Sequence, residues 1–206
     1  MTKDYVDMGV GVGVAVDTAF LLKTTEYDGG QLFEKIMQQM QRTPMIHEFI
    51  YKQELIGSEV ARNLVEKEIV HIITYKDFLT DVSLKDQYER IFRQAYKGMN
   101  GFPLPKDVDV FSYQRANENL GEIHTALMAQ HMNIDLMVSD DVGAKKYIEC
   151  HMNSSRHRLS VQNIPDVLIS LSETDRSRVK WQDLKGFAKS LYGIGKRYQE
   201  IRDYWV

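Results

Sequence analysis

Cysteine is nearly absent from this sequence of 206 residues, in which Cys150 is the single thiol. One thiol forms no internal disulfide and supplies no thiolate cluster for zinc, so we expect the protein to work in a reducing compartment. Histidine does not take the place of cysteine, because the histidines show no spacing typical of zinc ligands. They are His47, His71, His124, His131, His151 and His157.

Long hydrophobic runs are also missing. The Gly- and Val-rich run from Met8 to Val16 is too short to cross a bilayer, and Asp17 soon follows where a signal peptide would have a cleavage site. The run also lacks the Lys-Ser/Thr ending of a phosphate-binding loop. We therefore expect a soluble, cytoplasmic protein, and we interpret the run as a buried strand.

Charge is divided unevenly along the chain, although the net charge is only −3. Residues 1–141 hold 22 acidic and 14 basic side chains, whereas residues 142–206 hold 7 acidic and 12 basic ones. The sequence thus predicts an acidic body followed by a basic segment.

Apolar, β-branched runs alternate with amphipathic ones along the chain, and 43% of the residues are hydrophobic, enough for one core. Strands are predicted at 8–16, 69–75 and 134–138, and 159–164 with 167–171 is predicted to be a strand pair or a strand and a turn. Helices are predicted at 18–22, 31–40, 45–56, 84–97, 119–131 and 144–152, with another capped by Ser58. Thr43-Pro44 favours the helix at 45–56, because a capping hydroxyl precedes a proline at the first helical position.

This alternation predicts an α/β fold, a three-layer α/β/α sandwich with a mainly parallel central sheet. We expect one domain over residues 1–172. Residues 173–206 are expected to form a basic helical extension packed on that domain.

Acidic residues stand at two of the predicted strand ends. Asp17 follows the first strand, and Asp140-Asp141 follow the strand at 134–138. Ligands of an open parallel sheet bind beyond the carboxyl ends of its strands, so these carboxylates meet if the two strands are neighbours. Glu122 lies in the first turns of the helix that leads into the later strand, where the helix dipole also favours an acid.

Clustered carboxylates repel one another, and a cation is the ordinary means of stabilising such a cluster. Ligands that are all oxygen fit Mg²⁺ or Mn²⁺. Such an ion lowers the pKa of a bound water, orients a phosphate oxygen and stabilises charge on a leaving group. The pattern therefore predicts a site that hydrolyses phosphodiester bonds.

Three segments resemble the PIN domain family, named for the N-terminal part of PilT-like proteins. VAVDTAFLL at 14–22 is similar to the family's opening strand, which ends in Asp-Thr. LGEIHTALMAQHMNIDLMVSDDVGAKKYIE at 120–149 is similar to its acidic helix, following strand, terminal acid and next helix. In TPMIHEFIYKQEL at 43–55, Glu48 occupies the place of the family's helix-borne glutamate.

PIN domains are typically magnesium- or manganese-dependent ribonucleases, and many are toxins of toxin–antitoxin pairs. The resemblance implies catalytic or metal-supporting roles for Asp17, Glu48, Glu122 and one of Asp140 and Asp141. Asp141 is the ligand if Ser139 replaces the threonine of a Thr-x-Asp pattern. Asp140 is the ligand if the chain follows the acidic pattern of one subgroup through Ala144-Lys145.

The C-terminal segment at 181–205 mixes basic and aromatic residues, which can hold phosphates and stack bases. It also carries an apolar stripe of helical spacing, which favours a helix docked on the body; the stripe is Leu184, Phe187, Ala188, Leu191 and Ile194. The two interpretations are compatible if the outer face of the helix meets RNA. The candidate nucleic-acid contacts are Lys145, Lys185, Lys189, Lys196 and Arg197.

Together these features predict a metal-dependent endoribonuclease that activates water at Asp17, Glu122 and Asp140/Asp141. The expected cofactor is Mg²⁺ or Mn²⁺ and the expected substrate is RNA, while the resemblance also implies an antitoxin-like protein partner or a second copy of the chain. The alternative is a PIN-like module with little or no catalysis that binds RNA or a protein. Ala19 favours this alternative, because a polar residue commonly follows Asp-Thr in the family.

Overall fold

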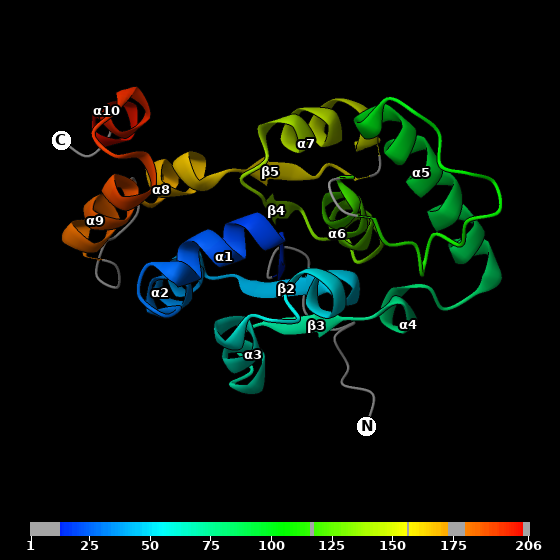
Figure 1. Ribbon diagram of the computed structural model, residues 1–206, viewed down its shortest axis with the longest axis horizontal. Helices are drawn as coiled ribbons and strands as arrows, with labels where there is room; N and C mark the ends of the chain where they lie inside the picture. The colour runs from blue at the N-terminus through cyan, green and yellow to red at the C-terminus, as the bar shows by residue number, and fades with distance from the viewer. Residues whose placement is uncertain (1–12, 116–117, 156, 173–179, 204–206) are drawn as a thin grey trace.

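A computed structural model describes residues 13–115, 118–155, 157–172 and 180–203, and a sheet of parallel strands lies at its centre (Figure 1). The strands are β1 (Gly13–Val16), β2 (Thr43–His47), β3 (His71–Ile73), β4 (Leu136–Val138) and β5 (Ser160–Gln162). Their order in the sheet is β3-β2-β1-β4-β5. The predicted α/β class with a parallel sheet is confirmed.

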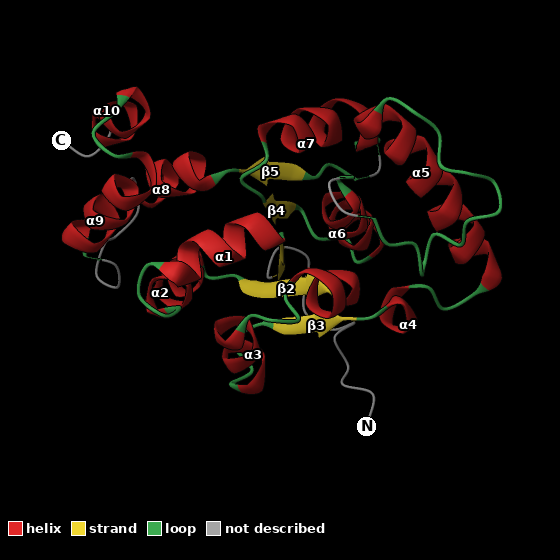
Figure 2. Ribbon diagram, viewed as in Figure 1, coloured by secondary structure: helices red, strands yellow, loops and turns green. Residues whose placement is uncertain are grey.

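Helices cover both faces of this sheet (Figure 2). Along the chain, the helices that follow β1 and precede β3 are α1 (Thr18–Glu26), α2 (Gln31–Met40), the π-helical turn η2 (Ile50–Glu54) and α3 (Glu59–Glu66). Between β3 and β5 lie α4 (Tyr75–Phe78), α5 (Val82–Asn100), α6 (Leu120–His131), α7 (Val142–Tyr147) and the π-helical η3 (Ile148–Met152). After β5 come α8 (Ile164–Ser172), α9 (Trp181–Tyr192) and α10 (Lys196–Asp203). None of these described helices is both long and apolar enough to span a membrane.

Side chains that alternate along the strands enter two separate cores, one on each face of the sheet. Val14 and Val16 of β1 pack with α1, α2, α3 and the helices after β5, whereas Ala15 packs with α5, α6 and α7. In β2, Ile46 packs in the same core as Val14 and Val16, and Met45 packs in the same core as Ala15. Because both faces are covered, the central strands β1 and β4 are apolar along their whole length, and helix, sheet and helix form three layers.

Strands β1 and β4 are neighbours although they are far apart in sequence. The register pairs Ala15 with Met45 on one side and with Met137 on the other. The chain moves outward from β1 to β3 and then returns to the other side of β1 for β4 and β5. A sheet of this kind opens a crevice where the direction reverses, beyond the carboxyl ends of β1 and β4.

The segment 43–56 differs from the prediction. Thr43–His47 form strand β2, with Thr43 opposite Gly13 and Pro44 opposite Val14. A proline is tolerated near the start of a strand, and β2 pairs with β3 only from Met45 onward. The predicted helix beginning at Thr43-Pro44 is therefore wrong, since the helical turn starts only after β2.

Several predicted boundaries agree with the structure. Ser58 caps α3 by accepting the Ala61 N–H at 3.2 Å, and α2 and α6 match their predicted ranges closely.

The predicted strand at 167–171 is wrong, because these residues lie inside α8. Asn163 and Asp166 cap that helix reciprocally, each accepting the other's backbone N–H at 3.0 Å. Residues 8–12 of the predicted first strand lie outside the described residues.

The helices after β5 pack on the same core as α1 and α2 and lie together at one end of the molecule (Figure 1). The buried residues of α9 and α10 in this core are Leu184, Phe187, Ala188 and Ile201. Phe187 meets Tyr27, next to the end of α1, edge to face with ring centroids 5.6 Å apart. The apolar stripe docks through its first residues only, since Ile194 is 73% exposed. Residues 173–179 and Trp205 of the expected extension lie outside the described residues.

Candidate active site

Asp17 stands where β1 ends and α1 begins. Its backbone N–H donates to the carbonyl of Val138 at 3.0 Å, which extends the β1–β4 ladder by one bond. Its buried carboxylate accepts the Ser139 hydroxyl at 3.0 Å and the Ala19 N–H at 3.4 Å. Donors from the ends of both central strands thus hold the Asp17 carboxylate in the crevice.

Glu122 reaches the same crevice from the other layer. Helix α6 leads into the parallel strand β4 and therefore runs antiparallel to it, so the N-terminal turn of α6 lies at the carboxyl edge of the sheet. Burial raises the pKa of Glu122 to about 8, and the charges of Asp17, Glu54 and Asp141 contribute. Burial, and then the charge of Glu54, raise the pKa of Asp17 to about 7. Full ionisation of these carboxylates is therefore unfavourable near neutral pH.

Glu54 is a member of this group that the sequence did not indicate. It lies at the end of the π-helical turn η2, and its carboxylate accepts the hydroxyl of Thr18. Gly121 leaves room for it, because a Cβ at that position would stand 2.6 Å from Glu54 Oε1. Burial raises the pKa of Glu54 as well.

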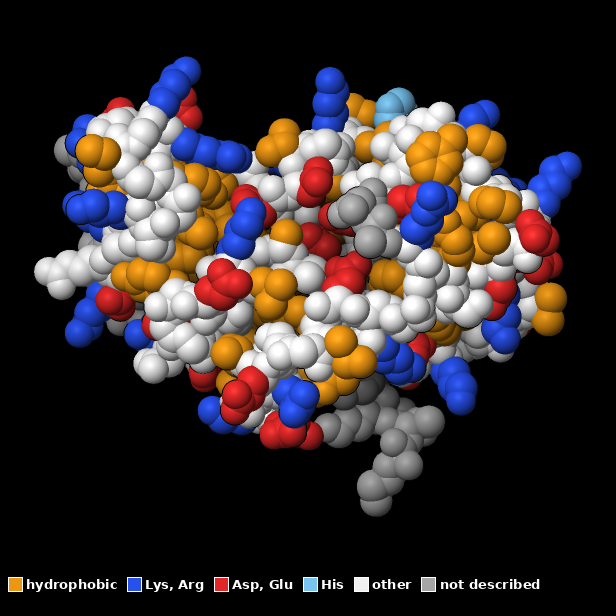
Figure 3. Space-filling view, in the orientation of Figure 1, with side chains coloured by type: hydrophobic (Ala, Val, Ile, Leu, Met, Phe, Trp, Pro, Cys, Tyr) orange, Lys and Arg blue, Asp and Glu red, His pale blue; other side chains and the backbone are white. Residues whose placement is uncertain are grey.

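A cavity of about 620 Å³ opens beside these carboxylates. Its lining consists of Asp17, Thr18, Ala19, Leu22, Phe49, Gln53, Glu54, Gln114, Arg115, Glu118, Asn119, Leu120 and Glu122. Figure 3 shows acidic side chains gathered near the middle of the face that is drawn. The lining is thus an acidic patch with apolar side chains around it, which restrict water near the carboxylates.

Asp140 and Asp141 point to different surroundings. Asp140 forms an ion pair of 2.6 Å with Lys23 of α1 and accepts the Ile164 N–H at 3.4 Å. Asp141 caps α7 by accepting the Ala144 N–H at 2.7 Å, and its charge acts on Glu122. Asp141 does not line the carboxylate cavity, although its charge contributes to the raised pKa of Glu122, while Asp140 is paired with Lys23.

Glu48 lies away from the lining of this cavity. Its carboxylate accepts the backbone N–H of Tyr75 at 2.7 Å and pairs with Lys52 of the same helical turn. Because β2 ends at His47, Glu48 stands directly after the strand and faces the beginning of α4. The glutamate that approaches Asp17 from this segment is Glu54.

The basic residues predicted to contact RNA do not line the cavity. Lys145 pairs with Asp166 at 2.6 Å, Lys196 pairs with Glu200 at 3.7 Å, and Arg197 lies over the Tyr192 ring at 5.2 Å. Lys185 and Lys189 are exposed on α9. Apart from Lys145, these residues belong to α9 and α10, at the end of the molecule where Figure 1 draws the C-terminus.

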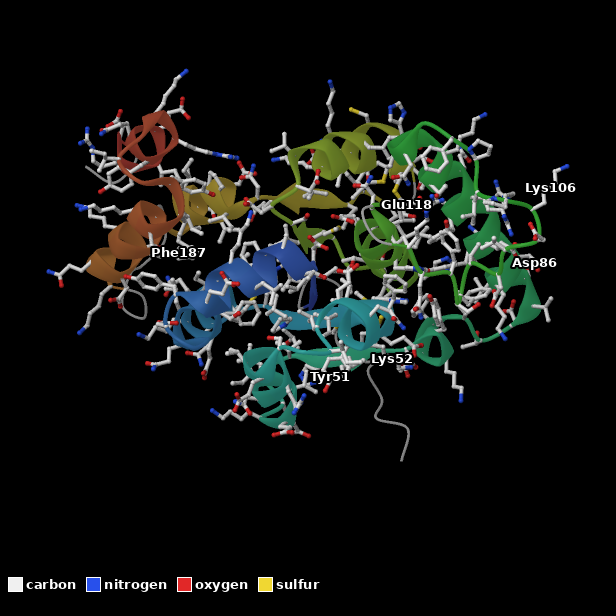
Figure 4. The ribbon with its side chains drawn as sticks, viewed as in Figure 1. Tyr51, Lys52, Asp86, Lys106, Glu118 and Phe187 are labelled. Carbon is white, nitrogen blue, oxygen red and sulfur yellow. The ribbon has the colours of Figure 1, made fainter. Side chains whose placement is uncertain are left out.

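The basic side chain of Arg115 lies in the lining of the cavity. Arg115 is paired through Nε with Glu118 Oε1 at 3.1 Å, and its side chain is 64% exposed. Glu118 is buried and also accepts the hydroxyls of Tyr96 and Tyr113. Figure 4 labels Glu118 between the helical layer of α6 and α7 and the right-hand end of the molecule. Glu118 is thus fully engaged by its own neighbours, which distinguishes it from Asp17 and Glu122.

The chemistry of the donor set suits a hard divalent cation. The convergent side chains offer carboxylate oxygens, and burial, followed by their mutual repulsion, raises the pKa values of Asp17 and Glu122. As the side chains lie, no three His, Cys, Asp or Glu residues within the described ranges are arranged to coordinate one ion. Coordination of one ion by three of these carboxylates would therefore require side-chain rotation.

No protein-family model, curated protein or solved structure matches this chain.

Proposed function

We propose that this chain is a PIN-like, metal-dependent ribonuclease that hydrolyses phosphodiester bonds in RNA. The observation that carries the proposal is the convergence of Asp17, Glu54 and Glu122 on one cavity, with Asp141 close enough to act on Glu122. These acids come from four separate segments of the chain. Nothing in local structure requires them to meet, and their repulsion is unfavourable unless a cation offsets it.

The position of the group supports the proposal. Asp17 and Asp141 follow β1 and β4, the two strands between which the order of the sheet reverses. Open α/β sheets bind their ligands at this point. Asp17, Glu122 and one of Asp140 and Asp141 are also acids that the resemblance to PIN domains implies, and Asp17 and Glu122 line the same cavity although they are distant in sequence.

The residues of the chain have separate tasks in the proposed reaction. Asp17, which accepts the Ser139 hydroxyl and the Ala19 N–H, and Glu122 would supply oxygen ligands to the ion once their side chains have rotated toward it. Glu54 accepts a proton from the attacking water, since its raised pKa favours the protonated form. A bound Mg²⁺ or Mn²⁺ supplies charge stabilisation at the phosphate oxygens and at the leaving group.

The bond changes are those of hydrolysis. The water oxygen forms a bond to phosphorus, the bond from phosphorus to the leaving sugar oxygen breaks, and solvent protonates that oxygen. The apolar side chains of Leu22, Phe49 and Leu120 line the cavity and restrict other water from the reacting atoms.

The test is cleavage of a labelled single-stranded RNA in the presence of Mn²⁺ by the wild type and by the Asp17→Asn variant. We expect Asp17→Asn to lower kcat/KM at least about 100-fold, because it removes a central ligand. Calorimetric titration with Mn²⁺ is the second readout, and binding should be lost with the same substitution. Undiminished cleavage by pure, folded Asp17→Asn protein would rule out the proposal.

A further inference from the structure

The carboxylate cavity adjoins two hollows on the outer surface of the helical layer formed by α5, α6 and α7. The cavity and the next hollow share Asn119, and that hollow also includes Asp141 of the candidate site. The second and third hollows share Tyr147 and His151. Their volumes are about 460 and 490 Å³. The shared residues define one groove that leads from the carboxylates along α5 and η3.

Charge changes along this groove. Four acids line the carboxylate cavity, namely Asp17, Glu54, Glu118 and Glu122. Among the described residues that line the two outer hollows, Asp141 is the single acid. Those hollows instead contain the exposed cations Lys146 and Arg90. The outer groove therefore suits a chain of negative charge, while the acidic end suits a cation.

An aromatic pair lies where the two outer hollows meet. Tyr147 and His151 are one helical turn apart, with ring centroids 4.8 Å apart and ring planes tilted by 41°. Tyr147 extends across to α5, where Gly98 gives it space, since a Cβ on Gly98 would overlap its ring. His151 is exposed beside it. Such a pair offers a flat, partly apolar surface of the kind on which bases stack.

The length of the groove follows from α5. Its lining on that helix runs from Met99 and Gly98 in the second hollow to Leu84 in the third. At 1.5 Å per residue this is a path of roughly 20 Å. A strand with a stacked spacing of about 3.4 Å per nucleotide covers it with about six nucleotides.

We infer that this groove, defined by Asn119, Lys146, Tyr147, His151 and Arg90, binds the strand of single-stranded RNA next to the bond that is cut. The inference rests on the proposed function for its substrate. Lys146 and Arg90 contact phosphates, and the Tyr147–His151 pair stacks on a base. The basic residues of α9 and α10 are then surface charges outside the path of the RNA.

The experiment is fluorescence anisotropy of a labelled 12-nucleotide single-stranded RNA in excess chelator, so that binding is measured without cleavage. The groove variant carries Arg90→Gln and Lys146→Gln, and a second variant carries His151→Ala. Lys67→Gln is the matched control, because the loop between α3 and the parallel strand β3 lies at the opposite edge of the sheet. Lys189→Gln with Arg197→Gln tests the C-terminal surface.

We expect the groove variant to bind about tenfold more weakly at low salt and to lower the slope of log affinity against log salt by about 1.4, as the loss of two phosphate contacts requires. His151→Ala should weaken binding about fivefold without changing that slope. Lys67→Gln and the C-terminal variant should bind like the wild type. A 4-nucleotide RNA should be less affected by the groove variant than the 12-nucleotide RNA.

The inference and the proposed function can fail separately. If the wild type binds the RNA in chelator through the groove but does not cleave it with Mn²⁺, the function fails and the groove stands. If the wild type cleaves while the groove variant keeps the same affinity and kcat/KM, the groove is overturned and the function stands. Wild-type affinity in the groove variant with weakened binding in the C-terminal variant overturns the groove, as does absence of RNA binding by the wild type.

Discussion

Two buried polar clusters lie on different sides of α6. One is the group of carboxylates around Glu122, and the other is a cluster of rings around His124, which we call the ring cluster. Glu122 faces the acidic cavity, whereas His124, two residues later, packs among the rings of His47, Tyr75 and Tyr88. Residues two apart on a helix point in different directions, so one helix serves both clusters.

The ring cluster is stable without charge. His47 and His124 stack with centroids 5.0 Å apart, and the Tyr88 hydroxyl lies 2.6 Å from His124 Nδ1. The Phe49 N–H donates to His47 Nδ1 at 3.0 Å. Burial, and then the charge of Lys52, lower the pKa of His47 to about 3, and burial also lowers that of His124.

The two clusters therefore differ in whether burial alone settles their charge. A buried imidazole is neutral at physiological pH, so burial alone resolves its electrostatics. Buried carboxylates that face one another must instead hold protons or bind a cation. We therefore place the chemistry at the acids, and the following substitutions test that assignment.

Exchange of Glu54 should have the largest effect on activity. Glu54→Gln keeps the size of the side chain but removes the proton acceptor proposed for the water, so we expect kcat/KM on RNA to fall at least about 100-fold. Glu48→Gln is the matched control, since Glu48 is held by Lys52 and Tyr75 away from the cavity. Equal losses in the two variants would contradict the assignment of the site.

The acidic cluster should destabilise the metal-free fold at alkaline pH. Between about pH 4, where carboxylates of the unfolded chain titrate, and pH 7 to 8, where Asp17 and Glu122 titrate in the fold, the folded protein holds more protons than the unfolded chain. The free energy of unfolding therefore decreases as pH rises through this window. In chelator at pH 8.5, Asp17→Asn should raise it on the order of 2 kcal/mol, measured by urea denaturation. A decrease at pH 8.5 would show that the Asp17 charge is already stabilised without an ion.

The ring cluster should have the opposite effect in acid, where the free energy of unfolding should decrease as the pH falls. The unfolded chain binds protons at its histidines below about pH 6.5, while buried His47 does not until about pH 3, so stability is lost as pH falls. From pH 6.5 to pH 5 this loss should be roughly 1.5 kcal/mol for His47. His47→Gln should flatten this slope in denaturation experiments at matched ionic strength. An unchanged slope would mean that His47 is protonated inside the fold.

Gly121→Ala should give a smaller effect confined to the acidic side. The added methyl would stand 2.6 Å from Glu54 Oε1 and move that carboxylate away from its position beside α6. We expect kcat/KM on RNA to fall about tenfold with little loss of stability, because the proton acceptor is displaced while the end of a flexible side chain can yield. Gly57→Ala is a control, since a Cβ there meets no atom within 4 Å. Undiminished kcat/KM in Gly121→Ala would contradict the role of Glu54 as proton acceptor.

Much of the fold could be predicted from sequence, because strand runs such as 134–138 and helix signals such as Ser58 act locally. The signal at Thr43-Pro44 is also local, and it led to the wrong prediction of a helix. The apolar residues Met45 and Ile46 pack into the cores on opposite faces of the sheet, and this tertiary requirement overrides the local preference for a helix.

The site could be predicted in part for related reasons. Asp17 and Asp141 follow strands that meet at one edge of the sheet, so their position depends on topology that the pattern indicates. Glu54 was missed because its direction depends on the π-helical turn at 50–54, which breaks the helical period used to read a sequence. The ion pair of Asp140 with Lys23 could not be predicted, because the distance between these residues is a property of the folded chain.

The bond between Ser139 and Asp17 joins residues 122 positions apart. During translation the first strand and its aspartate leave the ribosome long before β4 exists to complete the crevice. Contacts of such long range also slow folding. A partly synthesised chain that lacks β4 therefore carries no assembled carboxylate group, so the activity proposed for this group would begin only after the strand is complete and folded.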